Sequence, residues 1–332
     1  EIPLRLVGSE MCIRDRSKRT FKPVIFTFII LLSMIKTIPL LPQRKNAETM
    51  KLQIIDTGYF YADGGAMFGA IPKSAWSRRY PSDETNGCVL AMRSLVIKTD
   101  DGRIVLVDNG AGNKHLKQLS YYRFFNLVDL GTELRNRGIQ PEEITDVVLT
   151  HLHFDHCGYT TQKDESTGHL FLSFPNANHW VSRKQWENFL HPNALERDSY
   201  FIENMQAVAD ANSLRLLDAD TSICPTIELR LYDGHTPGQI VPYIHTEDRT
   251  FVFAGDVIPL VASVSPEWIS AYDTYPITSY NEKLRMLAEA AEKRQALIYC
   301  HDAYIRCTTV KRVNSYYKKD KEIPLKKTFL FP

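Results

Sequence analysis

Three histidines and an aspartate fall within six positions of the segment THLHFDHCG, directly after the apolar run ITDVVL. In an extended segment alternate side chains point to the same side, so His151 and His153 can face one way together. The chain must turn after the strand, and this turn lets Asp155 and His156 point back toward a neighbouring position. Two adjacent groups of imidazole nitrogens and carboxylate oxygens suit borderline and hard divalent cations. The segment therefore predicts a metal site in preference to three unrelated surface histidines.

Three further donor residues stand at the ends of strand-like runs downstream of this cluster. His235 lies in the loop GHTPG after IELRLYD, Asp256 follows TFVFAG, and His301 follows ALIYC. Residues at strand ends lie where the loops of a sheet converge on a site. One such residue would carry little information, but three of them after the cluster predict that they complete its metal coordination.

The order of these motifs resembles the metallo-β-lactamase superfamily of binuclear metallohydrolases. The motifs are H-x-H-x-D-H, G-H-T-P-G, G-D after an apolar strand and a late histidine, and the resemblance covers Met50 to Pro332. The stretches DGGAMFG, PKSAW, FPNANHWVS and GHTPGQ are most similar to the branch that holds quorum-quenching N-acyl-homoserine lactonases and methyl parathion hydrolase. The resemblance implies a four-layer αββα sandwich, an α/β or α+β fold in which two mixed β-sheets pack face to face with helices outside.

The resemblance also implies a role for each donor residue. One metal ion is expected on His151, His153 and His235, a second on Asp155, His156 and His301, and Asp256 as the bridge between them. Asp108 matches the acid of the family's D-T-G turn, which supports the cluster loop; as an alternative it is a plain turn residue. Asn109 replaces the threonine of that turn, which puts its hydrogen bonding in question. Two divalent ions are expected, zinc first, with manganese, iron and cobalt as alternatives.

The expected reaction is hydrolysis by a hydroxide that bridges the two metal ions and opens a lactone or cleaves a related ester. Asp155 is expected to help move a proton to the leaving group. The main alternative is a phosphotriesterase acting on aryl phosphotriesters with the same metals. A β-lactamase is disfavoured because the zinc enzymes of that kind commonly carry cysteine where Asp256 stands. A flavodiiron oxidoreductase would carry glutamate at His153, and a non-catalytic binding module would tend to lose ligands.

The expected substrate is a small molecule with an apolar acyl or aryl group, because aromatic residues stand near the motifs. The predicted pocket residues are Phe68, Trp76, Trp268 and Tyr272, each with ordinary core or loop packing as the alternative. The formal net charge of +1 and the absence of a basic block in the body of the chain argue against a nuclease and against nucleic acid as a partner. A homodimer and a monomer both stay open.

Composition and cysteine usage fit a globular protein. Apolar residues make up 44% of the 332 residues and charged residues 24%, which is enough for a sizeable core and too little charge bias for disorder. The six cysteines are scattered without a C-x-x-C pair, which excludes a zinc knuckle and predicts reduced, buried thiols.

The elements that must position the site are expected as one hydrolase domain over residues 50–332. A strand is expected at 51–58, a hairpin with an Asp-Asp-Gly turn over 88–112, and further strands at 144–150, 227–234, 250–258 and 296–300. Helices are expected at 121–139, 179–190, 199–212 and 279–295, the last with the clearest amphipathic pattern.

Residues 1–49 are expected to stand outside this domain. The basic stretch RDRSKRTFKP and the apolar run at 24–35 together resemble a signal or anchor over residues 14–42, but no small-residue cleavage site follows. The apolar run is also shorter than the roughly 20 residues that span a bilayer. The other interpretation is that VGSEMCIRDR is translated adapter sequence and that Met50 is the natural start. The protein is expected in the cytoplasm if Met50 is the start, and exported or membrane-tethered if the upstream segment is native.

Overall fold

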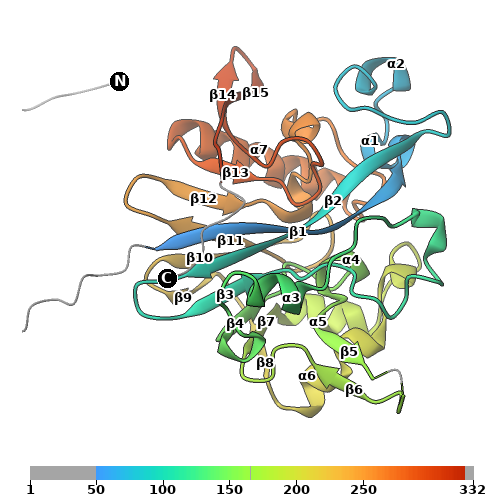
Figure 1. Ribbon diagram of the computed structural model, residues 1–332. Helices are drawn as coiled ribbons and strands as arrows, with labels where there is room; N and C mark the ends of the chain where they lie inside the picture. The colour runs from blue at the N-terminus through green and yellow to red at the C-terminus, as the bar shows by residue number, and fades with distance from the viewer. Residues whose placement is uncertain (1–49, 165, 326–332) are drawn as a thin grey trace, which may run out of the picture. The chain divides into compact units, whose positions relative to one another are not determined.

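The computed structural model of the protein describes residues 50–164 and 166–325 (Figure 1). The predictions about residues 1–49 lie outside these described residues. Within the described part of the chain, no helix combines the length and the apolar character that crossing a membrane requires.

The first sheet has six strands in the order β1-β2-β3-β4-β7-β8. The hairpin expected over 88–112 is confirmed as β2 and β3, which pair antiparallel, as do β1 and β2. From β3 onward the neighbours are parallel. The strands are β1 (Lys51–Asp63), β2 (Gly87–Lys98), β3 (Ile104–Val107), β4 (Asp146–Val148), β7 (Asn178–Ser182) and β8 (Leu214–Leu217).

The second sheet has seven strands in the order β15-β14-β13-β12-β11-β10-β9. Its neighbours are antiparallel except for β12 and β13. Every strand of the first sheet precedes every strand of the second, so the chain passes between the sheets once, between Leu217 and Thr221. The strands are β9 (Thr221–Cys224), β10 (Ile227–Tyr232), β11 (Gln239–His245), β12 (Thr250–Phe253), β13 (Ala296–Ile298), β14 (Cys307–Val313) and β15 (Tyr316–Glu322).

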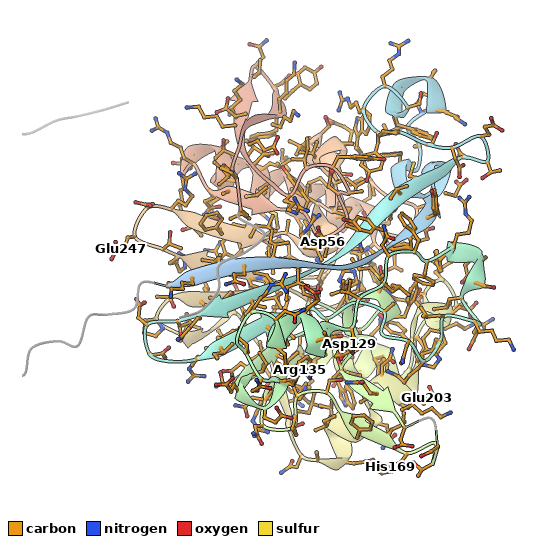
Figure 2. The ribbon with its side chains drawn as sticks, in the orientation of Figure 1. Asp56, Asp129, Arg135, His169, Glu203 and Glu247 are labelled. Carbon is orange, nitrogen blue, oxygen red and sulfur yellow. The ribbon has the colours of Figure 1, made fainter. Side chains whose placement is uncertain are left out.

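Helices cover the outer faces of the two sheets, and charged side chains such as Glu247 project from the surface (Figures 1 and 2). A small hairpin of β5 (Thr161–Lys163) and β6 (Leu170–Leu172) lies beside the first sheet. The helices are α1 (Gly64–Phe68), α2 (Lys73–Trp76), α3 (Leu130–Arg135), α4 (Phe154–Cys157), α5 (Arg183–Leu190), α6 (Gln206–Asp210) and α7 (Pro276–Glu292).

The core confirms the predicted four-layer sandwich of two mixed sheets with helices outside. Leu95 and Ile97 of β2 pack between the sheets against residues such as Phe253, whereas Val96 between them faces the helices outside. This alternation follows from the two-residue period of a strand. On the outer face of the second sheet, Leu287 of α7 belongs to a separate apolar cluster. Each sheet therefore buries both of its faces.

The helix predicted at 121–139 is wrong for its first two turns. Only α3 and a short 3-10 turn at Ser120–Tyr122 are helical there. Phe125 instead exchanges two backbone hydrogen bonds with Tyr59 of β1, at 3.0 and 2.9 Å. Arg123 and Asn126 on either side of Phe125 have positive φ angles of 48° and 49°, which a right-handed helix excludes. Tertiary pairing therefore replaces the helix that the apolar spacing predicts.

Two other helix predictions need correction in extent. The segment predicted at 179–190 begins as strand β7 and becomes helical only at Arg183, where the hydroxyl of Ser182 accepts the Gln185 N–H at 3.0 Å. The segment predicted at 199–212 is α-helical only in α6, after two 3-10 turns. The amphipathic helix predicted at 279–295 is confirmed as α7.

Candidate metal centre

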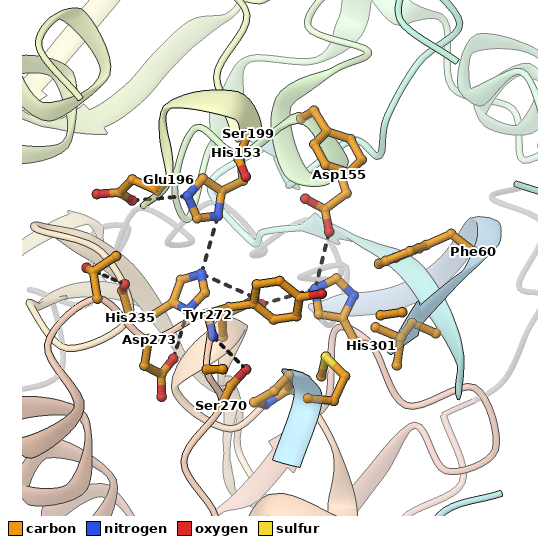
Figure 3. A pocket seen from close by; sticks show the side chains of 18 of the residues that line it. Phe60, His153, Asp155, Glu196, Ser199, His235, Ser270, Tyr272, Asp273 and His301 are labelled. Atoms are coloured by element: carbon orange, nitrogen blue, oxygen red, sulfur yellow. Dashed lines mark hydrogen bonds and ion pairs between the residues drawn. The ribbon is translucent and has the colours of Figure 1, made fainter. Parts of the chain in front are cut away.

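The structure brings all seven predicted donor residues together at the ends of strands. His151 and His153 follow β4, Asp155 and His156 lie in α4, and His235 follows β10. Asp256 lies in the 3-10 turn Gly255–Val257 after β12, and His301 follows β13 by three residues. Figure 3 shows His153, His235, His301 and Asp155 pointing into one space from different elements.

The donor atoms form two groups. In the first group, His153 Nδ1 lies 3.0 Å from His151 Nε2 and 3.3 Å from His235 Nε2. In the second group, His156 Nε2 and His301 Nε2 are 3.2 Å apart, and Asp155 Oδ2 lies 3.7 and 3.5 Å from them. The sequence-based division into two sets of three donors therefore corresponds to two sets that are close in space.

Asp256 lies between the two groups. Its Oδ2 is 3.4 Å from His235 Nε2, and its Oδ1 is 3.4 Å from His156 Nε2 and 3.2 Å from His301 Nε2. Burial opposes ionisation of Asp256, but the imidazoles of His301, His156 and His235 outweigh it and hold its pKa well below the usual range. An ionised carboxylate with one oxygen toward each group is placed to bind a cation on both sides.

The donor spacing fits metal coordination. Two donors that bind one zinc ion tetrahedrally at about 2.0–2.1 Å lie about 3.4 Å from each other, and the separations within each group are 3.0–3.7 Å. Burial opposes a charge on His301, yet the neighbouring Cys300 and Asp256 raise its pKa well above the usual value. The negative charge of Asp256 therefore favours a positive charge beside it. Five imidazoles and two carboxylates are a donor set for divalent cations.

Each imidazole is oriented by a bond from its other nitrogen. His156 Nδ1 donates to Asp108 Oδ2 at 2.8 Å, His235 Nδ1 to Asp273 Oδ1 at 2.9 Å, and His301 Nδ1 to the Ala91 carbonyl at 2.8 Å. His153 Nε2 donates to Glu196 Oε2 at 3.2 Å, and His151 Nδ1 faces Thr150 Oγ1 at 3.1 Å. These bonds place the proton on the outer nitrogen and leave the inner nitrogen free to coordinate, as in known metal sites.

Glu196 and Asp273 were not predicted from the sequence. Burial opposes ionisation of Glu196, but the hydrogen bond and charge of His153 lower its pKa to about 2. Its other oxygen accepts from Asn188 at 2.9 Å and from Asn193 at 2.6 Å. Both acids lie in loops of ordinary composition, and nothing in the sequence around them indicates a role. Their role becomes visible only from the histidine that each contacts in the folded chain.

Asp108 supports the cluster loop as predicted by the resemblance. It has a φ of 52°, and its carboxylate accepts the Thr150 N–H at 2.8 Å and the Thr150 hydroxyl at 2.9 Å in addition to His156. Asn109, which stands where the family has threonine, is also hydrogen-bonded. Its amide nitrogen donates to Thr160 Oγ1 at 2.8 Å, and its amide oxygen accepts from Tyr159 N at 2.9 Å.

Replacing Asp108 with Asn is expected to weaken metal binding by the second group about 10–100-fold. The amide keeps the shape of the carboxylate but has one acceptor oxygen for the three donors that Asp108 serves. Zinc titration against a chromophoric chelator measures the effect. The matched control is Asp129→Asn, which alters a carboxylate that accepts the Thr132 N–H at the start of α3. Equal zinc affinity in the two variants would contradict the role given to Asp108.

The loop of His235 is held by α7. Glu282 of α7 accepts the backbone N–H groups of Asp233 and Gly234, both at 2.9 Å. Gly234 packs directly on the backbone of Ser279, where a larger residue would not fit. Helix α7, which covers the outer face of the second sheet, therefore fixes the position from which His235 reaches the first group.

A cavity of about 150 Å³ opens over the two groups. An apolar cavity of roughly this size holds a benzene molecule, so a small ring or part of an acyl chain fits here. The polar floor includes His153, Asp155, His235, Asp256 and His301. The apolar wall consists of Phe60, Ala62, Met67, Leu90, Tyr122 and Phe154.

Only one of the four predicted pocket aromatics lines this cavity. Tyr272 does so, with 39% of its surface exposed. Phe68 and Trp76 are fully buried and stack at 5.1 Å between ring centroids, and Trp268 packs edge-on against Phe68 at 5.7 Å. For these three residues the alternative of core packing is correct, because the aromatic rings bury one another behind Met67 rather than facing the cavity.

The cysteine prediction agrees with the described residues. Cys88, Cys157, Cys224, Cys300 and Cys307 are buried, and none of these five forms a disulfide.

Comparison with known proteins agrees with this geometry. The model of the metallo-beta-lactamase superfamily matches residues 93–301. A protein from Staphylococcus aureus described as a probable metal-dependent hydrolase has 30% sequence identity and a TM-score of 0.76, covering 85% of this chain and 98% of that one. AidC, a dizinc quorum-quenching lactonase, has the same fold with a TM-score of 0.67 at 19% identity, covering 83% of this chain and 96% of AidC.

Among curated proteins, an N-acyl homoserine lactonase of Bacillus thuringiensis is 25% identical over 171 residues. The alignment covers 50% of this chain and 58% of that lactonase. The chain thus spans somewhat over half the length of the curated relatives it matches.

Proposed function

Because the chain belongs to the metallo-beta-lactamase superfamily of hydrolases, we propose that it is a binuclear enzyme that opens a lactone or cleaves a related ester. The observation that carries this proposal is the position of Asp256, whose two oxygens face separate donor groups at 3.2–3.4 Å. Asp256 would hold divalent cations together with the histidines of both groups, and such cations would supply the chemistry of two-metal hydrolytic sites. Zinc is the proposed metal, supported by the imidazole-rich donor set and by the dizinc lactonase of the same fold.

Two divalent cations bound here supply Lewis acidity toward a carbonyl oxygen and lower the pKa of water, so that hydroxide is available at neutral pH. The protein contributes proton transfer through Asp155, which lines the cavity with Oδ2 turned toward the second group. After hydroxide attack, Asp155 accepts the proton that the attacking oxygen still carries and delivers it to the leaving oxygen. In this role it serves as base and then as acid, as general acid–base catalysis requires.

Tyr272 orients the substrate at the mouth of the cavity. Among the described residues the structure gives its hydroxyl no hydrogen-bond partner, and burial together with Asp63 and Asp155 raises its pKa to about 12. The phenol therefore keeps its proton at neutral pH and can donate to an oxygen of the substrate. The apolar wall opposite, including Phe60 and Phe154, takes the acyl part of the substrate away from water.

The substrate is proposed to be uncharged. The described residues that line the cavity include no lysine or arginine, and the carboxylates of Glu196 and Asp273 are engaged by histidines. A carboxylate such as that of a β-lactam finds no lysine or arginine on this lining, whereas a lactone with an acyl group needs none. The lactonases of Bacillus thuringiensis among the relatives support the same choice of substrate class.

The test combines metal analysis with a panel of substrates. Protein purified with zinc is assayed on lactones of increasing acyl length, an aryl ester, an aryl phosphotriester and a β-lactam, beside chelator-treated and reconstituted samples. Two equivalents of metal and chelator-sensitive turnover of a lactone or ester are expected. Turnover of the phosphotriester alone would replace the proposal with the phosphotriesterase alternative, and a protein without stoichiometric metal would overturn both.

A further inference from the structure

The two donor groups differ in how their late histidine is held. His235 takes its orientation from within the second half of the chain, through Asp273 and through the bonds of Glu282 to residues 233 and 234. His301 instead takes its orientation from β2 of the first sheet. Its Nδ1 donates to the Ala91 carbonyl at 2.8 Å, and the Ala91 N–H donates to the His301 carbonyl at 2.9 Å. Both groups combine residues from the two sheets, but only the second group's late histidine has its ring oriented by a strand of the opposite sheet.

Arg93, two residues further along β2, adds two side-chain hydrogen bonds to this contact. Its guanidinium donates through Nη2 to the Asp302 carbonyl at 2.9 Å and through Nη1 to the Tyr299 carbonyl. These two carbonyls lie on either side of Cys300 and His301. One planar side chain thus holds both ends of the short segment that carries the second group's histidine.

The third nitrogen of the Arg93 guanidinium, Nε, holds the group in place. Its Nε donates to Asp56 Oδ1 of β1 at 2.9 Å, and the Arg93 side chain is 1% exposed. Asp56, labelled in Figure 2, also accepts from Arg306 Nη2 at 2.6 Å. The fork of an arginine can serve a carboxylate and two carbonyls at once, whereas a lysine ammonium cannot reproduce this planar geometry.

We infer that Arg93 is a positioning residue for the second metal position, acting through the backbone of residues 299–302. This inference rests on the proposed binuclear function. Without the guanidinium, the carbonyls of Tyr299 and Asp302 lose their donors and His301 is no longer held at 3.2 Å from His156. The three histidines of the first group make none of these contacts, and Asp256, which both groups share, meets this segment through the Cys300 thiol at 3.1 Å and His301 Nε2 at 3.2 Å. The first metal position is therefore expected to keep an affinity close to that of the wild type. Loss of Arg93 is therefore expected to weaken binding at the second metal position much more than at the first.

The experiment compares metal binding by the wild-type protein, Arg93→Lys and Arg93→Met. The lysine variant keeps a buried charge and a long side chain, which protects the test against simple failure to fold, and circular dichroism checks folding of both. Cobalt and zinc titrations, with metal content measured on dialysed protein, give the affinity of each equivalent. The first equivalent is expected to bind as in the wild type and the second about 10–100-fold more weakly, the size typical of lost outer-shell support.

The matched control is Arg230→Lys. Arg230 is partly buried, pairs with Glu228 and Glu289 at 2.9 and 2.8 Å, and lies 3.8 Å over the ring of Tyr243 on the outer side of the second sheet. This variant is expected to bind both equivalents as the wild type does. Unchanged binding of both metals by the Arg93 variants, or equal weakening of both, would overturn the inference. A wild-type protein that binds fewer than two metals would instead overturn the proposed binuclear function.

Discussion

Replacing Asp256 with Ala is expected to abolish stoichiometric binding of two metals and to lower kcat/KM by about 10³-fold or more. The residue is the only one of the seven predicted ligands whose oxygens face both groups, so its removal affects both positions at once. A Lewis-acid metal contributes several kcal/mol to a hydrolytic transition state, and about 1.4 kcal/mol corresponds to a factor of ten in rate. Metal content after dialysis and turnover of the best substrate from the panel are measured on the same preparation.

Two further variants define what Asp256 does. Asp256→Asn keeps the shape but removes the negative charge, and it is expected to retain one metal with strongly reduced turnover. Asp218→Ala is the control, because Asp218 is an exposed partner of Arg183 at 2.6 Å and surface pairs of this kind contribute little. Full activity and two metals in Asp256→Ala would exclude the bridging role.

Replacing Gly158 with Ala is expected to destabilise the protein by about 3 kcal/mol, the upper part of the range for overpacking. Gly158 has a φ of −62°, so the backbone conformation itself would tolerate a side chain. A Cβ there, however, would overlap the carbonyl group of Ala111 and the carbonyl oxygen of Phe154. This close approach joins α4, which carries Asp155 and His156, to the loop after Asp108. The variant is therefore expected to lose metal affinity as well as stability.

Thermal unfolding measures the first effect. A loss of about 3 kcal/mol lowers Tm by about 5–10 °C in a domain of this size. Gly102→Ala is the control, because no atom lies within 4 Å of a Cβ at Gly102 and its φ of 87° is the only source of strain. That variant is expected to lose about 1–2 kcal/mol with unchanged metal binding. If the Gly158 variant were as stable as the Gly102 variant, α4 could move away from the loop after Asp108 without a loss of folding free energy, which would contradict this prediction.

The donor residues were predictable because metal chemistry restricts residue types and because their motifs stand directly after apolar strands. The structure brings His151 and His301 into one site although 150 residues separate them, which the strand-end argument anticipates. Ligation itself stays a prediction until metal is measured. The layered architecture was predicted through the family resemblance, and helix α7 through its local amphipathic pattern.

The supporting residues were not predictable for the opposite reason. Glu196 and Asp273 are separated by 43 and 38 residues from the histidines they orient, and Arg93 by 206 residues from the Tyr299 carbonyl. Nothing in their immediate sequence distinguishes them from surface charges. The helix predicted at 121–139 failed similarly, because the pairing of Phe125 with Tyr59 is a tertiary event that apolar spacing cannot reveal.

The single passage of the chain between its two sheets has a consequence for biosynthesis. During translation the whole first sheet, with four of the seven donors, leaves the ribosome before the second sheet does. The side chains of Leu95 and Ile97, which point toward the second sheet, are then exposed to solvent. Nascent chains with such exposed apolar surface are prone to aggregate. Neither donor group is complete until its late histidine has been synthesised, so metal acquisition must be among the last steps in the maturation of this protein.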